Sequence, residues 1–184
     1  MKKLAALSLL SALLFVIAGC ETTSTRPYTS STKNVVMVQN KIKASYEKIK
    51  LGEFKQAENS GSLLCRLNGP VDVSPGKSQA EFIKEAFQTE LFLAQVYDPT
   101  SDIELSGTLN SIKFSSVSPA YWTLNFTISS NKSAGYTVET VYPFKTSFSA
   151  FGACRNVAEA FTPAVQALIS EILGNPNFSE LVEG

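Results

Sequence analysis

The hydrophobic repeat of this chain changes its period twice, and this change limits which folds the chain can adopt. Apolar side chains recur every three or four residues over Phe82–Ala94, every two residues over Ile103–Phe148, and again every three or four residues over Ala153–Leu173. The first spacing places side chains on one face of a helix, whereas period two places them on one face of a strand. The pattern therefore predicts a helix, a group of strands and a second helix.

The first helix has a clear beginning and a clear end. Ser78-Gln79-Ala80-Glu81 is a capping box, in which the serine side chain accepts a hydrogen bond from the third helical amide. The helix is predicted to begin at Gln79. Tyr97-Asp98-Pro99 stops it, because the residue before a proline disfavours helical backbone.

Three strands are predicted between the helices. In the first, the apolar residues change parity between Leu109 and Ile112, which requires a β-bulge near Asn110-Ser111. The second alternates regularly from Trp122 to Ile128.

The third strand begins at Tyr136, and its Pro143 indicates an edge strand or a bulge because proline lacks an amide donor. The short connections predict an antiparallel meander. The side chains expected on its core face are Tyr136, Val138, Tyr142, Phe144 and Phe148.

The part before the first helix is harder to interpret. Val35–Gln39 favours a strand, with a helix continuing through Tyr46 as the alternative. Lys48–Phe54 alternates and predicts a strand, and Gln56–Lys77 resembles a loop. We therefore expect an α+β fold: an antiparallel three-strand meander plus one or two N-terminal strands, packed against two main helices in β-α-β-β-β-α order.

The last helix contains Pro163, so it either kinks there or a second helix begins, capped by Thr162. Gly174-Asn175-Pro176 ends it, and Phe178–Val182 predicts a short terminal turn.

The N-terminus has the pattern of a bacterial lipoprotein signal that ends in a lipobox. Lys2 and Lys3 precede an apolar run, and Ile17-Ala18-Gly19 places small residues before Cys20. A transmembrane helix would need about 20 apolar residues, and this run is shorter. A cleaved secretory signal with an incidental cysteine is the stronger alternative. We predict that residues 1–19 are a signal peptide and that Cys20 is lipidated.

Lipoproteins that this pattern resembles are cut before the cysteine and acylated there, and the acyl chains anchor the protein firmly. Enterobacterial relatives kept at the inner membrane typically carry Asp at the next position. Glu21 stands there, so the outer membrane is expected, facing the periplasm. Residues 20–34 are expected to form a lipidated, Ser/Thr-rich flexible tether, and residues 35–184 a single periplasmic domain.

Composition argues against several functions. Cleavage before Cys20 would remove two lysines and leave 14 Lys+Arg against 16 Asp+Glu, a net charge of −2. A nucleic-acid partner is therefore not expected. The chain has no histidine, the commonest general base at neutral pH and the commonest metal ligand. We expect no metal, no cofactor and no catalytic site.

Two motifs resemble functional sites only weakly. Pro75-Gly76-Lys77-Ser78 ends like a phosphate-binding loop, but Val71 stands where that motif needs a glycine. The carboxylates Asp98, Asp102 and Glu104 flank a turn and lack calcium-loop spacing. We interpret the first as a turn leading into a helix cap and the second as a solvated turn.

Two cysteines remain after Cys20. In an oxidising periplasm, Cys65 and Cys154 most simply form one disulfide. Two buried free thiols and a redox role are the alternatives, and the absence of a CxxC motif disfavours the second.

Tyr121-Trp122 is the candidate partner contact. Trp122 has the core parity of its strand, whereas Tyr121 has the opposite parity near the strand end, where it can anchor a partner.

The order of lipobox, tether, strand, helix, meander and final helix resembles the YajG-like family of small Gram-negative outer-membrane lipoproteins. The similar stretches are Phe82–Tyr97, Ile103–Leu109 and Phe148–Leu173, with Asn156-Val157-Ala158-Glu159-Ala160 inside the last. The arrangement is also similar to the TolB N-terminal domain and to lipoprotein activators of peptidoglycan synthases. The second resemblance implies a protein-binding module without catalysis.

We therefore expect a membrane-anchored, non-enzymatic module that binds another protein of the cell envelope. The alternative is a carrier of a small apolar or glycan ligand. An enzyme using Asp102, Glu104 or Lys77 is the third hypothesis.

Overall fold

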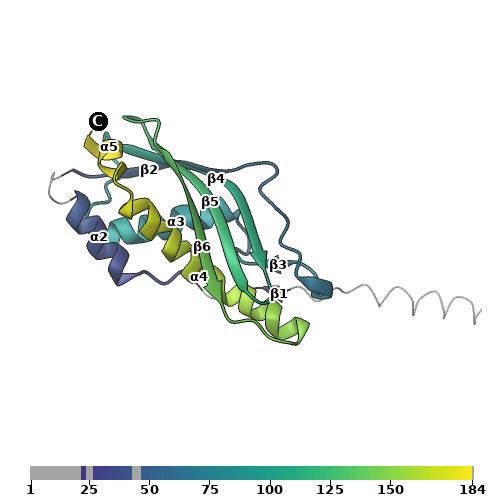
Figure 1. Cartoon of the computed structure of the whole chain (residues 1–184). Helices are drawn as coiled ribbons and strands as arrows, with labels where there is room; N and C mark the ends of the chain where they lie inside the picture. Colours follow the sequence, from purple (N-terminus) through teal and green to yellow (C-terminus); the bar gives the residue numbers. More distant parts are fainter. Residues whose placement is uncertain (1–21, 24–26, 43–46, 184) are drawn as a thin grey trace, which may run out of the picture.

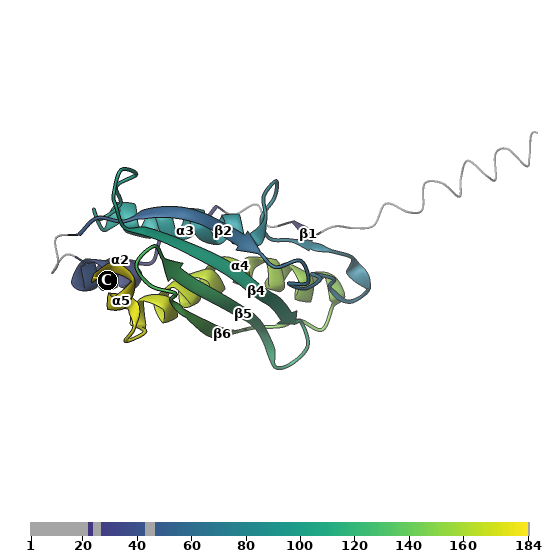
Figure 2. The same cartoon turned by 90° about the horizontal axis from the view of Figure 1, so that it is seen from above.

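A four-stranded sheet with helices on one face forms the domain, which confirms the predicted α+β class (Figure 1; Figure 2). The structure, a computed structural model, describes residues 22–23, 27–42 and 47–183. The whole predicted signal peptide, Cys20, and residues 21 and 24–26 of the predicted tether lie outside these residues. Within the described residues, no helix is both long enough and apolar enough to cross a bilayer.

The strand order in the sheet is β2-β4-β5-β6. Strands β4 (Glu104–Ser115), β5 (Ala120–Ser130) and β6 (Tyr136–Phe144) form the predicted antiparallel meander. The register of β4 shifts between Leu109 and Ser111, where the bulge was predicted, and β6 is an edge strand. Strand β2 (Lys50–Gln56) pairs parallel with β4, an arrangement that no local signal predicts.

Two long helices cover one face of the sheet. Helix α3 (Gln79–Leu93) begins where the capping box predicts, and the amide of Glu81 donates to Ser78 Oγ at 3.1 Å. Helix α4 (Ala150–Gly174) contains Pro163 within one continuous helix, so the prediction of a second helix from Thr162 is wrong. The terminal turn is helix α5 (Phe178–Glu183).

The region predicted as a strand over Val35–Gln39 is instead part of helix α2 (Thr32–Ile42), so the helical alternative is confirmed as far as Ile42. Its predicted continuation through Tyr46 lies outside the described residues. Asn34, Val38 and Ile42 are buried at four-residue spacing on one helix face. Asn34 Nδ2 donates to the carbonyl of Gln166 in α4 at 2.9 Å. The polar Asn34 therefore occupies one of the inward-facing positions. The apolar residues of the sequence alone do not show the four-residue spacing of this helix.

The flexible tether predicted over residues 20–34 extends too far toward the C-terminus, because residues from Tyr28 onward contact the domain. The Tyr28 hydroxyl donates to Glu90 Oε1 at 2.5 Å, and the amide of Ser31 donates to the same oxygen at 2.8 Å. Burial and the neighbouring Glu90 raise the pKa of Tyr28 above its usual range. Residues 27–34 are thus packed on the domain through the buried Glu90.

A second small pairing lies farther toward the N-terminus. Strand β1 (Thr22–Thr23) pairs parallel with β3 (Val71–Asp72). Between β2 and β3 the chain is mostly loop, as predicted, with one 3-10 turn, η2 (Arg66–Asn68).

Aromatic side chains fill the interior between the sheet and the helices. Trp122 is fully buried, its ring centroid lies 5.2 Å from that of Phe161, and Phe161 packs in turn on Phe82 at 5.2 Å. The indole Nε1 donates to the carbonyl of Val157 in α4 at 3.0 Å. This bond satisfies the polar atom of a buried tryptophan and fixes α4 over β5.

Candidate interaction surface at one end of the sheet

Three segments that are far apart in sequence meet at one end of the molecule: residues 64–68 around η2, the β4–β5 turn, and residues 145–151 at the start of α4 (Figure 1; Figure 2). We call this region the apolar end, because large apolar side chains there are 60% to 108% exposed. These side chains are Leu64, Leu67, Val117, Phe148 and Phe151. Such a group on a monomer surface typically marks an interaction site.

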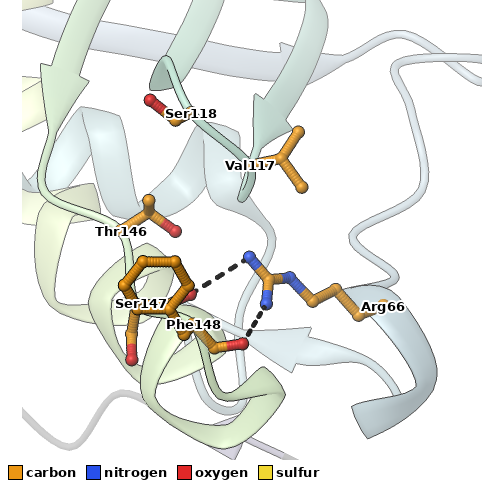
Figure 3. A pocket seen from close by; sticks show the side chains of 6 residues that line it. All are labelled: Arg66, Val117, Ser118, Thr146, Ser147 and Phe148. Carbon is orange, nitrogen blue, oxygen red and sulfur yellow. Dashed lines mark hydrogen bonds between the residues drawn. The ribbon is translucent and has the colours of Figure 1, made fainter.

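Arg66 holds the three segments together. Its guanidinium donates to the carbonyl of Ser116 at 2.7 Å. It also donates to the carbonyls of Ser147 and Phe148 at 3.3 Å each, the two bonds marked in Figure 3. Its Nε donates to Ser116 Oγ at 3.2 Å. Arg66 has a φ of 51°, a backbone conformation that a residue other than glycine rarely adopts.

An open cleft of about 670 Å³ lies between these segments, with Arg66, Val117 and Phe148 among its lining residues (Figure 3). A volume of this size falls in the range of small-molecule sites, roughly 300–1,000 Å³. The polar groups of the cleft are largely engaged with one another, since the Arg66 guanidinium spans it. The Thr146 hydroxyl also donates to the carbonyl of Ser116.

The predicted disulfide is present directly beside Arg66. The Cys65 and Cys154 sulfurs are 2.08 Å apart, and both residues are fully buried. The alternative of two free thiols is therefore wrong. The bond links the η2 segment to α4 and so fixes the base of the apolar end.

The two residues predicted as a partner contact point in opposite directions. Trp122 is fully buried in the core, so it cannot contact a partner. Tyr121 lies on the open face of the sheet, directly opposite Pro143 of the edge strand β6, and Val141 lies opposite Thr123 on the same face. We call Tyr121, Val141 and Pro143 the Tyr121 patch.

The rest of the open face is polar. The Asn110 amide donates to Asn125 Oδ1 at 2.9 Å and to Thr127 Oγ1 at 2.8 Å, and the hydroxyls of Thr127 and Thr137 are 2.7 Å apart. Within the described residues, no helix covers this face (Figure 2). An antiparallel sheet tolerates water on one face when that face is polar.

The weaker candidates of the sequence are not brought together. Lys77 forms an ion pair with Glu85 at 2.5 Å beside the start of α3, and Glu104 pairs with Lys50 at 3.5 Å at the other end of the sheet. The described residues contain no group of three or more Cys, Asp or Glu placed to hold a metal ion.

Asp98 closes its own turn. The Thr100 hydroxyl and the Thr100 amide both donate to its Oδ1, at 2.7 and 2.8 Å. The hydroxyl bond first, and then the amide bond, lower the pKa of Asp98 below its usual value. The solvated-turn interpretation of this residue is confirmed.

Sequence reasoning missed Arg66, Leu67 and Phe148. Phe148 was expected on the core face of the third strand, but β6 ends at Phe144 and the Phe148 side chain is 108% exposed. A signal was nevertheless present. Large apolar residues stand among turn-forming residues in Arg66-Leu67-Asn68-Gly69-Pro70 and in Ser147-Phe148-Ser149.

These features define an α+β domain with one sheet face covered by helices, the other open, and an exposed apolar end. The same fold occurs in the crystal structure of a Xanthomonas campestris protein of family DUF330. The two share 13% sequence identity and a TM-score of 0.52, over 84% of this chain and 92% of that one. No family model and no curated protein matches the sequence.

Proposed function

We propose that the chain is a lipid-anchored, non-enzymatic module of the Gram-negative envelope, related to the YajG-like lipoproteins, that binds another envelope protein. The lipobox ending at Cys20 supports anchorage, with the outer membrane as its destination. One structural observation supports binding: the half-buried Tyr121 and the exposed Val141 and Pro143 lie together at the edge strand, on the sheet face that no described helix covers.

The chemistry of the Tyr121 patch suits a protein contact. A tyrosine offers a large apolar surface with a hydroxyl at its tip and loses little conformational entropy when a partner covers it. Its cross-strand neighbour Pro143 and the 57%-exposed Val141 add rigid apolar surface on β6. The hydrogen-bonded polar side chains elsewhere on this face are already paired and provide less reason to bind.

Photocrosslinking in intact cells tests the partner. A crosslinking amino acid in place of Tyr121 should trap a discrete protein adduct, which mass spectrometry then identifies. The matched control is Ser129, which lies on the same face of β5 at the other end of the strand. No adduct at position 121, or equal adducts at both positions, would contradict the proposal.

Anchorage is tested separately by labelling cells with palmitate. The full chain should incorporate the label and fractionate with the outer membrane, and Cys20→Ser should lose the label. An unlabelled full chain would refute lipidation whatever the crosslinks show.

The carrier alternative rests on the cleft beside Arg66 and its volume of about 670 Å³. A carrier purified from native membranes should retain a ligand that native mass spectrometry detects. Phe148→Ser should then reduce the ligand-bound fraction, because Phe148 lines the cleft.

A further inference from the structure

We propose that the apolar end rests on the bilayer interface beside Cys20, with Leu67 and Phe148 inserted between lipid headgroups. The proposal rests on the proposed lipid anchorage for the position of the membrane. It adds which surface of the domain contacts lipid, and hence how the domain stands on the membrane.

The argument begins with Thr22, whose place on the domain is determined by two hydrogen bonds. Its amide donates to the carbonyl of Pro70 at 3.1 Å, and its hydroxyl accepts from Asn68 Nδ2 at 2.8 Å. One residue separates Thr22 from Cys20, so the two Cα atoms can be at most about 7 Å apart. An acylated Cys20 therefore holds the surface around Thr22 at the depth of the headgroups, which form a layer roughly 5–7 Å thick on each side of the bilayer.

The exposed apolar residues begin next to this point. Leu67 directly precedes Asn68, the residue that binds Thr22, and its side chain is 103% exposed. Arg66, one residue earlier, holds the carbonyl of Phe148 at 3.3 Å. The most exposed large apolar side chains of the described domain thus lie on the segments that the anchor brings nearest to lipid.

A contact between an arginine and a phenylalanine beside the apolar end also suits a lipid surface. The Arg155 guanidinium lies over the Phe151 ring, 5.9 Å from its centroid, and its Nε is 4.0 Å from Glu159 Oε1. An arginine beside aromatic side chains is typical of surfaces that enter a membrane interface, where the ring is buried among headgroups and the cation meets anionic lipid.

A second protein could also cover the apolar end. The distance from Thr22 to Cys20 favours lipid, because so short a connection leaves little room for a protein between this end and the membrane. The protein alternative remains a distinct outcome of the test.

Vesicle flotation of the mature chain, residues 20–184 with Cys20→Ser, tests the proposal without the lipid anchor. The vesicles contain phosphatidylethanolamine and phosphatidylglycerol. The parent chain should float with the vesicles, and Leu67→Ser with Phe148→Ser should reduce the partition coefficient by about tenfold or more, as expected for losing two buried apolar side chains.

The matched control is Phe92→Ser with Leu93→Ser. These residues are also a Phe and a Leu, 69% and 47% exposed, but they lie on the last turn of α3. The control should float like the parent chain. Urea unfolding, followed by Trp122 fluorescence, should show that both variants remain folded.

Several outcomes would overturn the proposal. The first is that the folded parent chain does not float with the vesicles. The second is that both double variants lose flotation equally. The third is that a crosslinker in place of Phe148 traps a protein in cells and no lipid. Because this chain lacks the Cys20 thiol, its flotation does not depend on lipidation. Failure of the anchor in the palmitate experiment is therefore distinguishable from failure of the lipid contact.

Discussion

The two ends of the sheet satisfy the polar groups of their turns with different kinds of side chain. At the end opposite the apolar end, which we call the polar end, short polar side chains hold the turns, both within one turn and between two turns. Inside the β5–β6 turn, Ser130 Oγ accepts from the amides of Lys132 and Ser133 at 3.0 Å each. Asn131 accepts from the amide of Glu104 at 2.9 Å and donates to the carbonyl of Asp102 at 2.7 Å. At the apolar end, Arg66 reaches in from another segment to satisfy the turn carbonyls, and large apolar side chains project outward.

We propose that this difference separates side chains that stabilise turns, at the polar end, from side chains that contact another surface, at the apolar end. Turns held by short polar side chains are sufficient to end strands in water. Within the described residues, none of the exposed large apolar side chains lies in the turns at residues 98–103, 131–135 or 175–177. The exposed leucines and phenylalanines of the apolar end form the surface that we propose to contact lipid.

The largest effect is expected from the covalent link at the apolar end. Cys65→Ala with Cys154→Ala removes a bond across 89 positions of sequence, and the loop-closure estimate is a loss of about 4 kcal/mol in the free energy of unfolding. Urea denaturation with and without reductant measures it. An unchanged midpoint would show that the apolar end does not depend on the disulfide.

Arg66→Ala should cost about 1.5 kcal/mol in the free energy of unfolding, at the low end for hydrogen bonds from a charged donor because Arg66 is exposed. Hydrogen exchange should increase at the amides of Gly152 and Ala153, which donate to Ser149, next to the two carbonyls that lose their donor. Arg66→Lys is the control. It should recover only part of the loss, because an ammonium cannot reach several acceptors as the planar guanidinium does.

A matched substitution at the polar end should affect stability without affecting lipid contact. Asn131→Ala loses the bonds to Glu104 and Asp102 and should cost about 1 kcal/mol in the free energy of unfolding. Its flotation with vesicles should equal that of the parent chain. Reduced flotation of a folded Asn131→Ala would remove the distinction between the ends.

The smallest effect concerns pH and the polar end. The folded pKa of Asp98 lies below its unfolded value, so Asp98 contributes stability above the unfolded pKa and loses it as the pH falls through the folded pKa. When the free energy of unfolding is plotted against pH, Asp98→Asn should therefore show a slightly smaller slope than the parent chain below about pH 4. At higher pH the two curves should run parallel. Urea midpoints measured across this range check the slope.

Features that leave a local signal were predictable from the sequence. The change of parity after Leu109 predicted the bulge, Ser78 predicted the start of α3, and Pro143 predicted an edge strand. Each depends on the chemistry of one or two neighbouring residues.

Features that depend on distant segments were not predictable. The parallel pairing of β2 with β4 has no turn to indicate it, and α2 was missed because Asn34 occupies a buried position through its bond to Gln166. The apolar end was missed for the same reason. Arg66 and Phe148 are 82 residues apart and meet only in the folded domain.

One measurement compares the two ends directly in the full chain, held at the membrane by the proposed lipid on Cys20. Single cysteines in place of Phe148 and of Lys132, each labelled with an environment-sensitive fluorophore, report the surroundings of the apolar and the polar end in outer-membrane vesicles. We predict that the probe at position 148 is blue-shifted and quenched by lipids with quenchers near the headgroups, while the probe at position 132 stays in water. Equal emission and equal quenching at both positions would contradict the account.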